Sequence, residues 1–264
     1  MIKKMQAILS KNQIILITGA CGRLGTAVAI NAASNKIDVI ISDIDIYELK
    51  KLKKKILNSF KIEVFILVAD ISNHKGINSL LKESLKFKGI ISAAVNAAYP
   101  RSKGWGGKIE DIKEEYLKED LFSQLGGAIL FSKEIIKIFQ SQGFGNLINI
   151  SSIQGFMAPK FDHYEGTNMN SPIEYSAIKA GIISITKWLA KYYSNQNIRV
   201  NCVSPGGILD KQPESFLSKY RKSCTNIGML SADEHVADTI LFLISDKSSA
   251  INGQNIIIDD GWSL

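Results

Sequence analysis

The sequence predicts a doubly wound α/β domain, with about seven parallel strands and helices on both faces of one sheet. Two observations predict it: apolar, β-branched runs of strand length recur along the chain, and segments of helical periodicity separate them. The size agrees, because 264 residues, 45% of them hydrophobic, suffice for one large domain with a sizeable core. We therefore expect a single domain over residues 1–264, with ligands bound beyond the carboxyl ends of the strands.

The predicted strands are nearly continuous in apolar character, which is typical of strands buried on both faces of a parallel sheet. They lie at residues 14–18, 38–43, 64–70, 90–97, 146–152, 198–205 and 255–260. The predicted helices lie between them, at residues 23–34, 45–59, 74–86, 113–140, 174–194 and 232–245. Strict alternation of strand and helix indicates a Rossmann-type sheet without a second domain.

Charge and targeting signals exclude several classes of protein. The net charge is +7, but most of the basic excess lies in residues 48–61, where leucines at helical spacing predict one amphipathic helix with a solvated lysine face. A nucleic-acid partner would need a gathered basic patch instead. Residues 1–13 are too weakly apolar for a signal peptide, and no apolar run reaches about 18 residues. We expect a soluble, cytoplasmic protein with no membrane partner.

Metal-dependent and hydrolytic chemistry are poorly supported. The three cysteines, Cys21, Cys202 and Cys224, have the spacing of neither a zinc site nor a disulfide framework. Only three histidines are present, and neither HExxH nor GxSxG occurs. We therefore expect no metal site and no Ser-His hydrolase.

The first predicted strand runs into a glycine pattern, "TGACGRLG". Gly19, Gly22 and Gly25 are spaced three apart and open a helix. Small residues let the backbone turn tightly and approach a pyrophosphate, which the helix N-terminus then stabilises. Arg23 and Leu24 lie within the pattern and are placed in the same site; the Arg23 side chain could face a phosphate or meet solvent.

The second predicted strand ends at Asp43, about 20 residues past the glycines, where an acid can accept hydrogen bonds from the adenosine ribose hydroxyls. A carboxylate there repels a 2′-phosphate, so Asp43 favours NAD over NADP, while Arg23 is the argument for NADP. Alternatively, Asp43 is a turn residue that caps the next helix.

Other strand ends supply further candidates for the same site. The acid in "ADIS" could accept a hydrogen bond from the adenine amine or cap a helix, and the small residues of "VNAAYP" could pass beneath a flat ligand. The backbone of the Pro-Gly turn in "VSPGGI" could meet a carboxamide. The residues expected to contact the cofactor here are Asp70, Ile71, Asn96, Ala97, Ala98, Pro205, Gly206 and Ile208.

The stretch "IEYSAIKAG" places Tyr175 and Lys179 one helical turn apart, on the same face of the predicted helix. A tyrosine has a pKa near 10 and is a poor base at neutral pH, but a nearby cation favours the phenolate. Lowering the pKa by about three units requires roughly 4 kcal/mol, which Lys179 and an oxidised nicotinamide ring could together supply. A chance surface pair is the alternative; the strand end "NISSIQG", with Ser152, argues for a catalytic device.

Taken together, these motifs resemble those of the short-chain dehydrogenase/reductase family. The resemblance rests on "TGACGRLG", "ADIS", "VNAAYP", "NISSIQG", "YSAIKAG", "NIRVNCVSPGGI" and "INGQNIIIDDGWSL", and it covers nearly the whole chain. Length and ending look like the branch of roughly 250 residues. The glycine spacing looks more like the larger, sugar-nucleotide-modifying branch, because Arg23 stands where the short branch has its middle glycine.

The resemblance implies roles for single residues. Tyr175 would be the catalytic acid/base, Lys179 its partner on the nicotinamide ribose, and Ser152 the hydroxyl that holds the substrate oxygen. Gln124, in "FSQLGGAIL", stands where the family has a catalytic asparagine and could hold the water that links Lys179 to solvent. Asp210 stands where many members have a threonine that touches the cofactor.

Three loops are expected to form the substrate side, at residues 99–112, 155–173 and 206–230. The second carries an insert between the catalytic serine and tyrosine that is longer than usual in the short branch. The insert resembles that of dehydrogenases in flagellin-glycan and nonulosonic-acid sugar pathways. A polar, cation-rich rim would suit a sugar or phosphorylated sugar, although each residue could equally belong to a solvated loop. The candidate substrate contacts are Arg101, Lys160, His163 and Tyr164.

We therefore expect an NAD(P)-dependent oxidoreductase that interconverts a hydroxyl and a ketone on a polar, sugar-like substrate. An NAD-dependent sugar epimerase or dehydratase, or a non-catalytic dinucleotide-binding protein, are the alternatives. By resemblance, helices 113–140 and 174–194 would also pair subunits into a homodimer or homotetramer. Their apolar residues could equally pack on the sheet.

Overall fold

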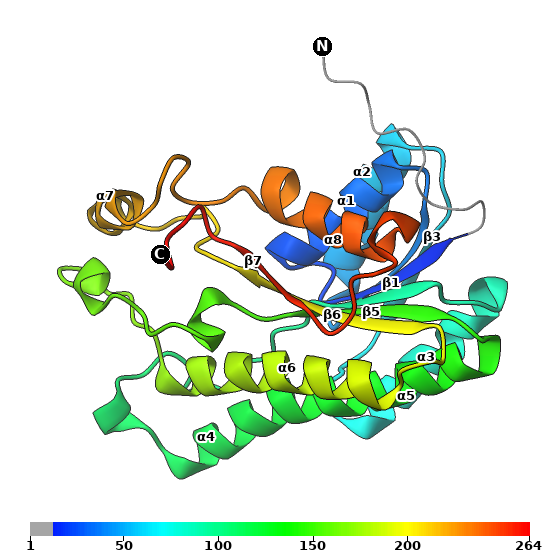
Figure 1. The fold of residues 1–264 in the computed structure, drawn as a ribbon, viewed down its shortest axis with the longest axis horizontal. Helices are drawn as coiled ribbons and strands as arrows, with labels where there is room; N and C mark the ends of the chain where they lie inside the picture. The colour runs from blue at the N-terminus through cyan, green and yellow to red at the C-terminus, as the bar shows by residue number, and fades with distance from the viewer. Residues whose placement is uncertain (1–12) are drawn as a thin grey trace.

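A computed structural model describes residues 13–264, so the expectation that residues 1–13 carry no signal peptide lies almost wholly outside it. Seven parallel strands form one sheet in the order β3-β2-β1-β4-β5-β6-β7 (Figure 1). The strand order reverses between β1 and β4, which creates a crevice at the carboxyl ends of these two strands. The predicted doubly wound α/β class is confirmed.

All seven predicted strands exist, with shorter bounds for several of them. They are β1 Ile14–Thr18, β2 Asp38–Asp43, β3 Val64–Val68, β4 Ala93–Asn96, β5 Gly145–Ile150, β6 Ile198–Pro205 and β7 Asn255–Ile258. The central strands are buried on both faces, as predicted. The edge strands are not: Val68 in β3 is 55% exposed and Ile257 in β7 is 45% exposed, because an edge strand has a neighbour on one side only.

Helices cover both faces of the sheet (Figure 1). One face carries α1 Arg23–Ser34, α2 Ile46–Ser59 and α8 Asp238–Ile244, and the other carries α3 His74–Lys88, α5 Gly127–Gln142 and α6 Ile173–Tyr192. Because strand side chains alternate between faces, Ile15 and Ile17 of β1 join the first core, whereas Ile14 and Leu16 join the second. In α2 the lysine-rich face is solvated as predicted, with Leu49, Leu52 and Ile56 buried.

Two predicted helices contain a wider π-helical turn. The segment predicted at residues 113–140 consists of α4 Glu114–Asp120, a π turn Leu121–Gly126 and then α5. The segment predicted at residues 232–245 begins with a π turn, Ala232–Ala237, before α8. A single π turn is too short to be recognised from apolar periodicity, and such turns are frequent at functional sites.

One helix was not predicted. The segment 206–230, expected to be a loop, contains α7 Glu214–Lys222 after Pro213. Its buried residues, Phe216 and Tyr220, are four apart and face a small separate core. With nine residues it is too short for a clear periodic signal. Short 3₁₀ turns complete the fold at Ile109–Asp111, Ile153–Gly155, Phe161–Tyr164 and Asp246–Ser248.

Within residues 13–264, none of the helices has the length and apolar character needed to cross a membrane.

Candidate active site

The glycine loop after β1 has no room for side chains. Gly19 has a φ of +63°, and a Cβ there would lie 2.6 Å from the carbonyl oxygen of Ala97 at the end of β4. A Cβ on Gly25 would lie 2.2 Å from the carbonyl oxygen of Gly19. Gly22 is the N-cap of α1 and offers no side chain to the first amide groups of the helix. The loop is therefore a bare backbone surface at a helix N-terminus, and it fits a pyrophosphate.

Asp43 is fixed beside this loop. Its Oδ2 accepts a hydrogen bond from the amide of Cys21 (2.9 Å), and its Oδ1 accepts one from the amide of Ile44 (2.8 Å). It does not cap α2, because the N-cap is Asp45, whose side chain accepts from Tyr47 and Glu48. Burial, reinforced by the Asp43 charge, raises the pKa of the Cys21 thiol to about 12, so the thiol stays protonated.

Arg23 points to the opposite side of the crevice. It forms an ion pair with Asp210, in the loop after β6, and its Nη1 donates to the carbonyl oxygen of Ile208 (3.3 Å). Both charged side chains are roughly half exposed, at 41% and 48%. Arg23 thus joins the start of α1 to the loop after β6, where Asp210 neutralises its charge.

Side chains at the ends of β3 and β4 form hydrogen bonds that stabilise the chain around the crevice. Asp70 accepts from the amide of Ser72 (2.9 Å) and from the side chain of Asn73 (3.1 Å); the N-cap of α3 is Asn73 itself. Asn96 accepts a hydrogen bond from the Thr18 hydroxyl (3.1 Å), which ties β4 to β1 at the point where the strand order reverses. Asp70 and Asn96 therefore shape the turns expected to meet the adenine amine and to pass beneath a flat ligand.

The remaining predicted cofactor residues lie at the same edge of the sheet. Ala97 and Ala98 continue from β4, Ile71 is buried in the core, and Leu24 is in the first turn of α1. At the end of β6, the Pro-Gly turn is packed against α7, because the Gly207 amide donates to the Tyr220 hydroxyl (2.5 Å). Ile208 pairs with Leu230 in an isolated bridge.

Tyr175 and Lys179 project from the first turns of α6 beside the end of β5. Lys179 Nζ donates to the carbonyl oxygen of Ile150 (3.0 Å) and lies 5.5 Å from the ring centroid of Tyr175. The Ser151 hydroxyl donates to the carbonyl oxygen of Lys179 (2.7 Å). Ser152, next along the chain, accepts from the amide of Gln154 (3.2 Å). The end of β5 and the turn of α6 that bears Tyr175 and Lys179 are therefore held together by direct hydrogen bonds.

The pKa values of Tyr175 and Lys179 differ from the expectation that the phenol pKa is lowered. Burial raises the pKa of Tyr175, and a hydrogen bond with Ser152 opposes the rise. Burial lowers the pKa of Lys179 to about 8. The predicted lowering of the phenol pKa counted two cations, Lys179 and an oxidised nicotinamide; Lys179 alone does not offset the cost of charging a buried phenol.

Gln124 lies in the π turn between α4 and α5. The residue is 6% exposed, and neither its Oε1 nor its Nε2 has a hydrogen-bond partner among residues 13–264. A buried amide without partners is costly, so this side chain is suited to holding a small polar molecule.

An aromatic cluster surrounds the phenol. The rings of Tyr99, Trp105 and Tyr175 lie edge to face, with centroids 5.4, 5.8 and 6.0 Å apart. Lys179 Nζ lies 5.3 Å from the centroid of Tyr99. Sequence reasoning missed Tyr99, although it directly follows the small residues of "VNAAYP". The signal was an aromatic residue at the carboxyl end of a central strand.

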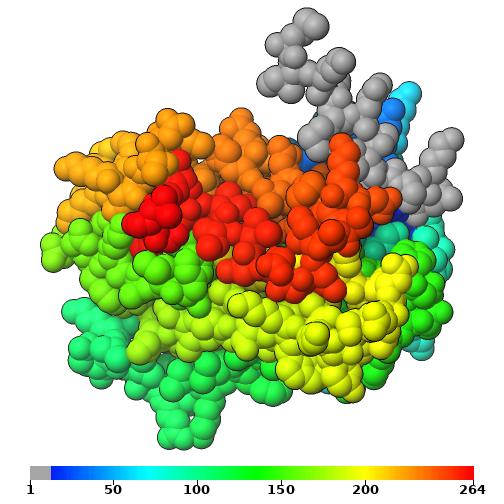
Figure 2. All heavy atoms as spheres, in the orientation of Figure 1, coloured from blue at the N-terminus to red at the C-terminus, as the bar shows by residue number. Residues whose placement is uncertain are grey.

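Two predicted rim residues pack against other segments: His163 is buried and Lys160 is half-buried. His163 is 2% exposed, and its ring contacts those of Phe216, Tyr220 and Trp262 edge to face. Lys160 donates to the carbonyl oxygen of Trp262 (3.2 Å) and lies 4.7 Å over its ring. Lys160 joins the insert to the C-terminal segment, and His163 joins it to both that segment and α7. Figure 2 shows the C-terminal segment in red between α7, in orange, and the insert, in green. The expectation that His163 lines the substrate rim is therefore wrong, because its ring is buried against α7, which was not anticipated. The expectation for Lys160 stays a prediction.

The other two predicted rim residues remain near the phenol. Tyr164 is half-buried, and its hydroxyl accepts from Gln154 Nε2 (3.4 Å). Arg101 is exposed, with its guanidinium carbon 5.5 Å from the centroid of Tyr99. These positions leave both residues available to a substrate.

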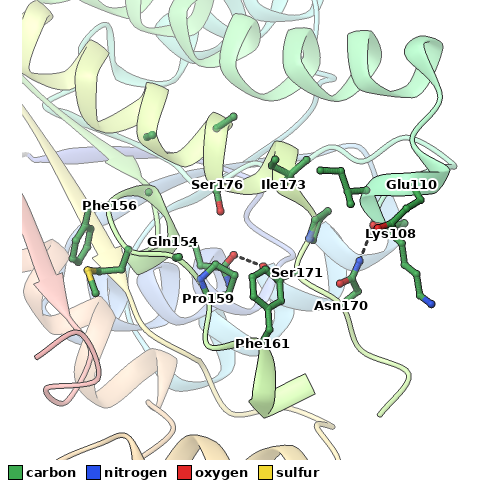
Figure 3. A pocket seen from close by; sticks show the side chains of 18 residues that line it. Lys108, Glu110, Gln154, Phe156, Pro159, Phe161, Asn170, Ser171, Ile173 and Ser176 are labelled. Atoms are coloured by element: carbon green, nitrogen blue, oxygen red, sulfur yellow. Dashed lines mark hydrogen bonds between the residues drawn. The ribbon is translucent and has the colours of Figure 1, made fainter. Parts of the chain in front are cut away.

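A hollow of about 800 Å³ lies between the first two predicted substrate loops (Figure 3). On α6 it is lined by Ile173, Ser176, Ala177 and Ala180. Tyr175 and Lys179 do not line it, so it lies beside the predicted catalytic pair. Figure 3 shows Gln154 and Ser171 meeting in it, joined by a hydrogen bond of 2.5 Å. Gln154 is thus shared between this hollow and the site around Tyr175.

Known proteins with this architecture are similar over the whole length of the chain. Residues 19–263 match the family model described as enoyl-(acyl carrier protein) reductase. The post-translational flagellin modification protein A of Campylobacter coli is 44% identical over 256 residues, which cover 96% of this chain and 99% of that protein. The 7alpha-hydroxysteroid dehydrogenase of Bacteroides fragilis is 29% identical over 259 residues, covering 96% and 95%. The crystal structure of a short chain dehydrogenase from Leptospira borgpetersenii with bound NAD+ has 28% identity and a TM-score of 0.84, covering 100% and 98% of the two chains.

Proposed function

This chain belongs to the short-chain dehydrogenase/reductase family of NAD(P)-dependent oxidoreductases, and we propose that it interconverts a hydroxyl and a ketone on a polar, sugar-like substrate. The observation that carries the proposal is that Tyr175 has both the Ser152 hydroxyl and the Lys179 ammonium beside it, at the same sheet edge as the glycine loop. In an open α/β sheet, that edge is where a dinucleotide and its substrate meet.

NAD is the proposed cofactor, with NADP second. Asp43 is held by two backbone amides at the end of β2, where a 2′-phosphate would be repelled. Arg23, the residue that favoured NADP, is engaged with Asp210 on the other side of the crevice. The similar Leptospira structure contains NAD+, which supports the same choice.

The proposed chemistry divides between cofactor and protein. The nicotinamide, when bound, accepts or supplies the hydride. Tyr175 Oη removes the proton from the substrate hydroxyl in oxidation and returns one in reduction. The Ser152 hydroxyl holds the substrate oxygen, and the Lys179 ammonium stabilises the phenolate. Gln124 is proposed to hold a water that carries the proton between Lys179 and solvent.

The proposed substrate is a sugar or phosphorylated sugar, reached through the loops at residues 99–112, 155–173 and 206–230. The name of the Campylobacter relative, a flagellin modification protein, supports a role in making a flagellin-linked sugar. Because His163 is buried in packing, the substrate contacts proposed are Arg101 and Tyr164, with Lys160, which is half-buried against Trp262, as a further candidate.

A homodimer or homotetramer is also proposed, through the faces of α5 and α6 that point away from the sheet. Large apolar residues are exposed there or in the adjoining π turn, namely Phe122, Ile129, Ile173 and Trp188. Light scattering after gel filtration tests this. A cytoplasmic location is proposed as well, which the three free thiols support.

The decisive experiment has two steps. NAD+ binding is measured first, and then phosphorylated and nucleotide sugars are screened for a change in the absorbance of reduced nicotinamide, with the Tyr175→Phe variant in parallel. Net cofactor turnover that depends on Tyr175 supports the proposal. A converted sugar without net turnover would identify an epimerase, and a physiological effect that survives Tyr175→Phe would identify a non-catalytic binding protein.

A further inference from the structure

We propose that Tyr99 is a positioning residue, which keeps the buried Lys179 side chain in its charged form by presenting the face of its ring to the ammonium. The inference deepens the proposed function, because it concerns the charge on which phenol ionisation depends. Nothing in the family pattern used above assigns a role to this position.

The geometry is that of a cation–π contact. Lys179 Nζ lies 5.3 Å from the centroid of Tyr99 and 5.5 Å from that of Tyr175, within the distance of about 6 Å at which a ring attracts a cation. Lys179 is 7% exposed, so water screens this attraction little. Such contacts are strongest where the cation has lost its water.

Lys179 has few other sources of stabilisation. It donates one hydrogen bond, to the carbonyl oxygen of Ile150, and forms no ion pair with a carboxylate in the part of the chain the structure describes. The titratable group on β6 that faces it is Cys202, and burial raises the pKa of that thiol to about 12, so it carries no compensating charge at neutral pH. The two tyrosine rings are therefore the main partners left for the ammonium.

Tyr99 is held in place by contacts of its own. It follows β4, which Asn96 ties to β1, and its ring meets Trp105 at 5.4 Å and 85°. The Tyr99 residue is 41% exposed, and Lys179 Nζ lies over the face of its ring. The exposed Arg101 lies at 5.5 Å from the same ring, but solvent screens its charge.

The contact matters because the ammonium is close to losing its proton. Burial lowers the pKa of Lys179 to about 8. Removing a ring face makes the charged form still less favourable, so the pKa would fall further and Lys179 would become neutral nearer pH 7. The phenolate of Tyr175 would then lose the cation that stabilises it.

The experiment compares Tyr99→Phe, which keeps the ring, with Tyr99→Leu and Tyr99→Met, which remove it. Lysine labelled with 13C at Cε is titrated by NMR in the cofactor-free protein, and the Lys179 signal is identified by its loss in Lys179→Met. We expect the Phe variant to titrate like the wild type and the Leu and Met variants to titrate about half to one pH unit lower. The alkaline limb of the activity profile should move down by the same amount. If the Tyr99→Leu variant does not fold, the Tyr99→Met variant provides the same test.

Two outcomes would overturn the inference. One is an unchanged Lys179 midpoint in both the Leu and the Met variants. The other is a Phe variant that shifts as far as they do, since that would assign the effect to the hydroxyl. Failure of the proposed function is recognised separately, because a wild-type protein that takes up no dinucleotide still allows the Lys179 titration to be measured.

Discussion

Arg23 at the start of α1 forms an ion pair with Asp210 in the loop after β6. In the resemblance drawn from the sequence, each residue departs from the family pattern, one replacing a glycine and the other a threonine. The structure shows that the two departures meet and neutralise each other. Because both side chains are roughly half exposed, the ion pair contributes only about 0–1 kcal/mol to the stability of the fold. Its importance is that each residue neutralises the charge that the other would otherwise present to the crevice.

Breaking this pair from either side should change dinucleotide affinity in opposite directions. Arg23→Ala leaves the Asp210 carboxylate uncompensated near the anionic ligand, so we expect affinity to fall about two- to fivefold. Asp210→Ala frees the guanidinium, so affinity should rise, and more for NADP than for NAD. Fluorescence titration at low and moderate salt measures both, and the double variant should return near to wild type. Two single variants that change affinity in the same direction would contradict charge compensation.

Asp43 should decide between the two dinucleotides. Asp43→Asn keeps an acceptor for the Cys21 amide but removes the charge that repels a 2′-phosphate. We expect NAD affinity to fall about tenfold, since hydrogen bonds to a charged acceptor are worth about 1.5–3 kcal/mol, while NADP affinity rises. Calorimetric titration with both ligands provides the test. Asp45→Asn, which alters only the cap of α2, is the matched control and should leave both affinities unchanged.

Tyr175 should be needed for turnover and not for cofactor binding. Removing the acid/base hydroxyl in Tyr175→Phe should lower kcat by about 10²- to 10⁴-fold, while NAD affinity changes less than about threefold. Tyr192→Phe, in the last turn of the same helix, is the control and should keep full activity. Retained turnover in Tyr175→Phe would remove the residue from the chemistry.

Gln124 should show opposite effects on stability and rate. Its buried amide has no partner among the described residues, so Gln124→Leu removes an unsatisfied polar group and should raise the free energy of unfolding by up to about 1 kcal/mol. If the amide holds the proton-relay water, the same variant should lower kcat. Thermal unfolding and steady-state kinetics, measured on one preparation, test both halves. A variant that is more stable and fully active would show that the relay does not pass through this residue.

His163 should make stability depend on pH. Burial lowers its pKa in the folded protein, opposed by the charge of Asp162 and assisted by Lys160 and Lys219. The unfolded chain therefore binds a proton at higher pH than the folded one, so stability is full above about pH 6.5 and falls as the pH drops below it. The melting temperature of the wild type should decrease between pH 7.5 and 5.5 more steeply than that of His163→Phe. Equal slopes would show that His163 does not contribute to the decrease.

The positions of the strands and of the strand-end residues predicted to bind the cofactor follow from local sequence, because a buried parallel strand is apolar and ligands bind beyond its carboxyl end. Asp43, Tyr175 and the glycines could therefore be located without the structure. The burial of His163 could not, since it depends on α7, whose nine residues give no clear period. Tyr99 was missed for a similar reason: its contact with Lys179 exists only once the end of β4 and the start of α6 are brought together.

The insert that carries Lys160 and His163 is anchored to Trp262, which lies 102 residues after Lys160 in the chain. The glycine loop and the turn that bears Tyr175 leave the ribosome well before Trp262 does. The order of synthesis would therefore allow the predicted cofactor side of the site to form before the predicted substrate loop gains its anchor.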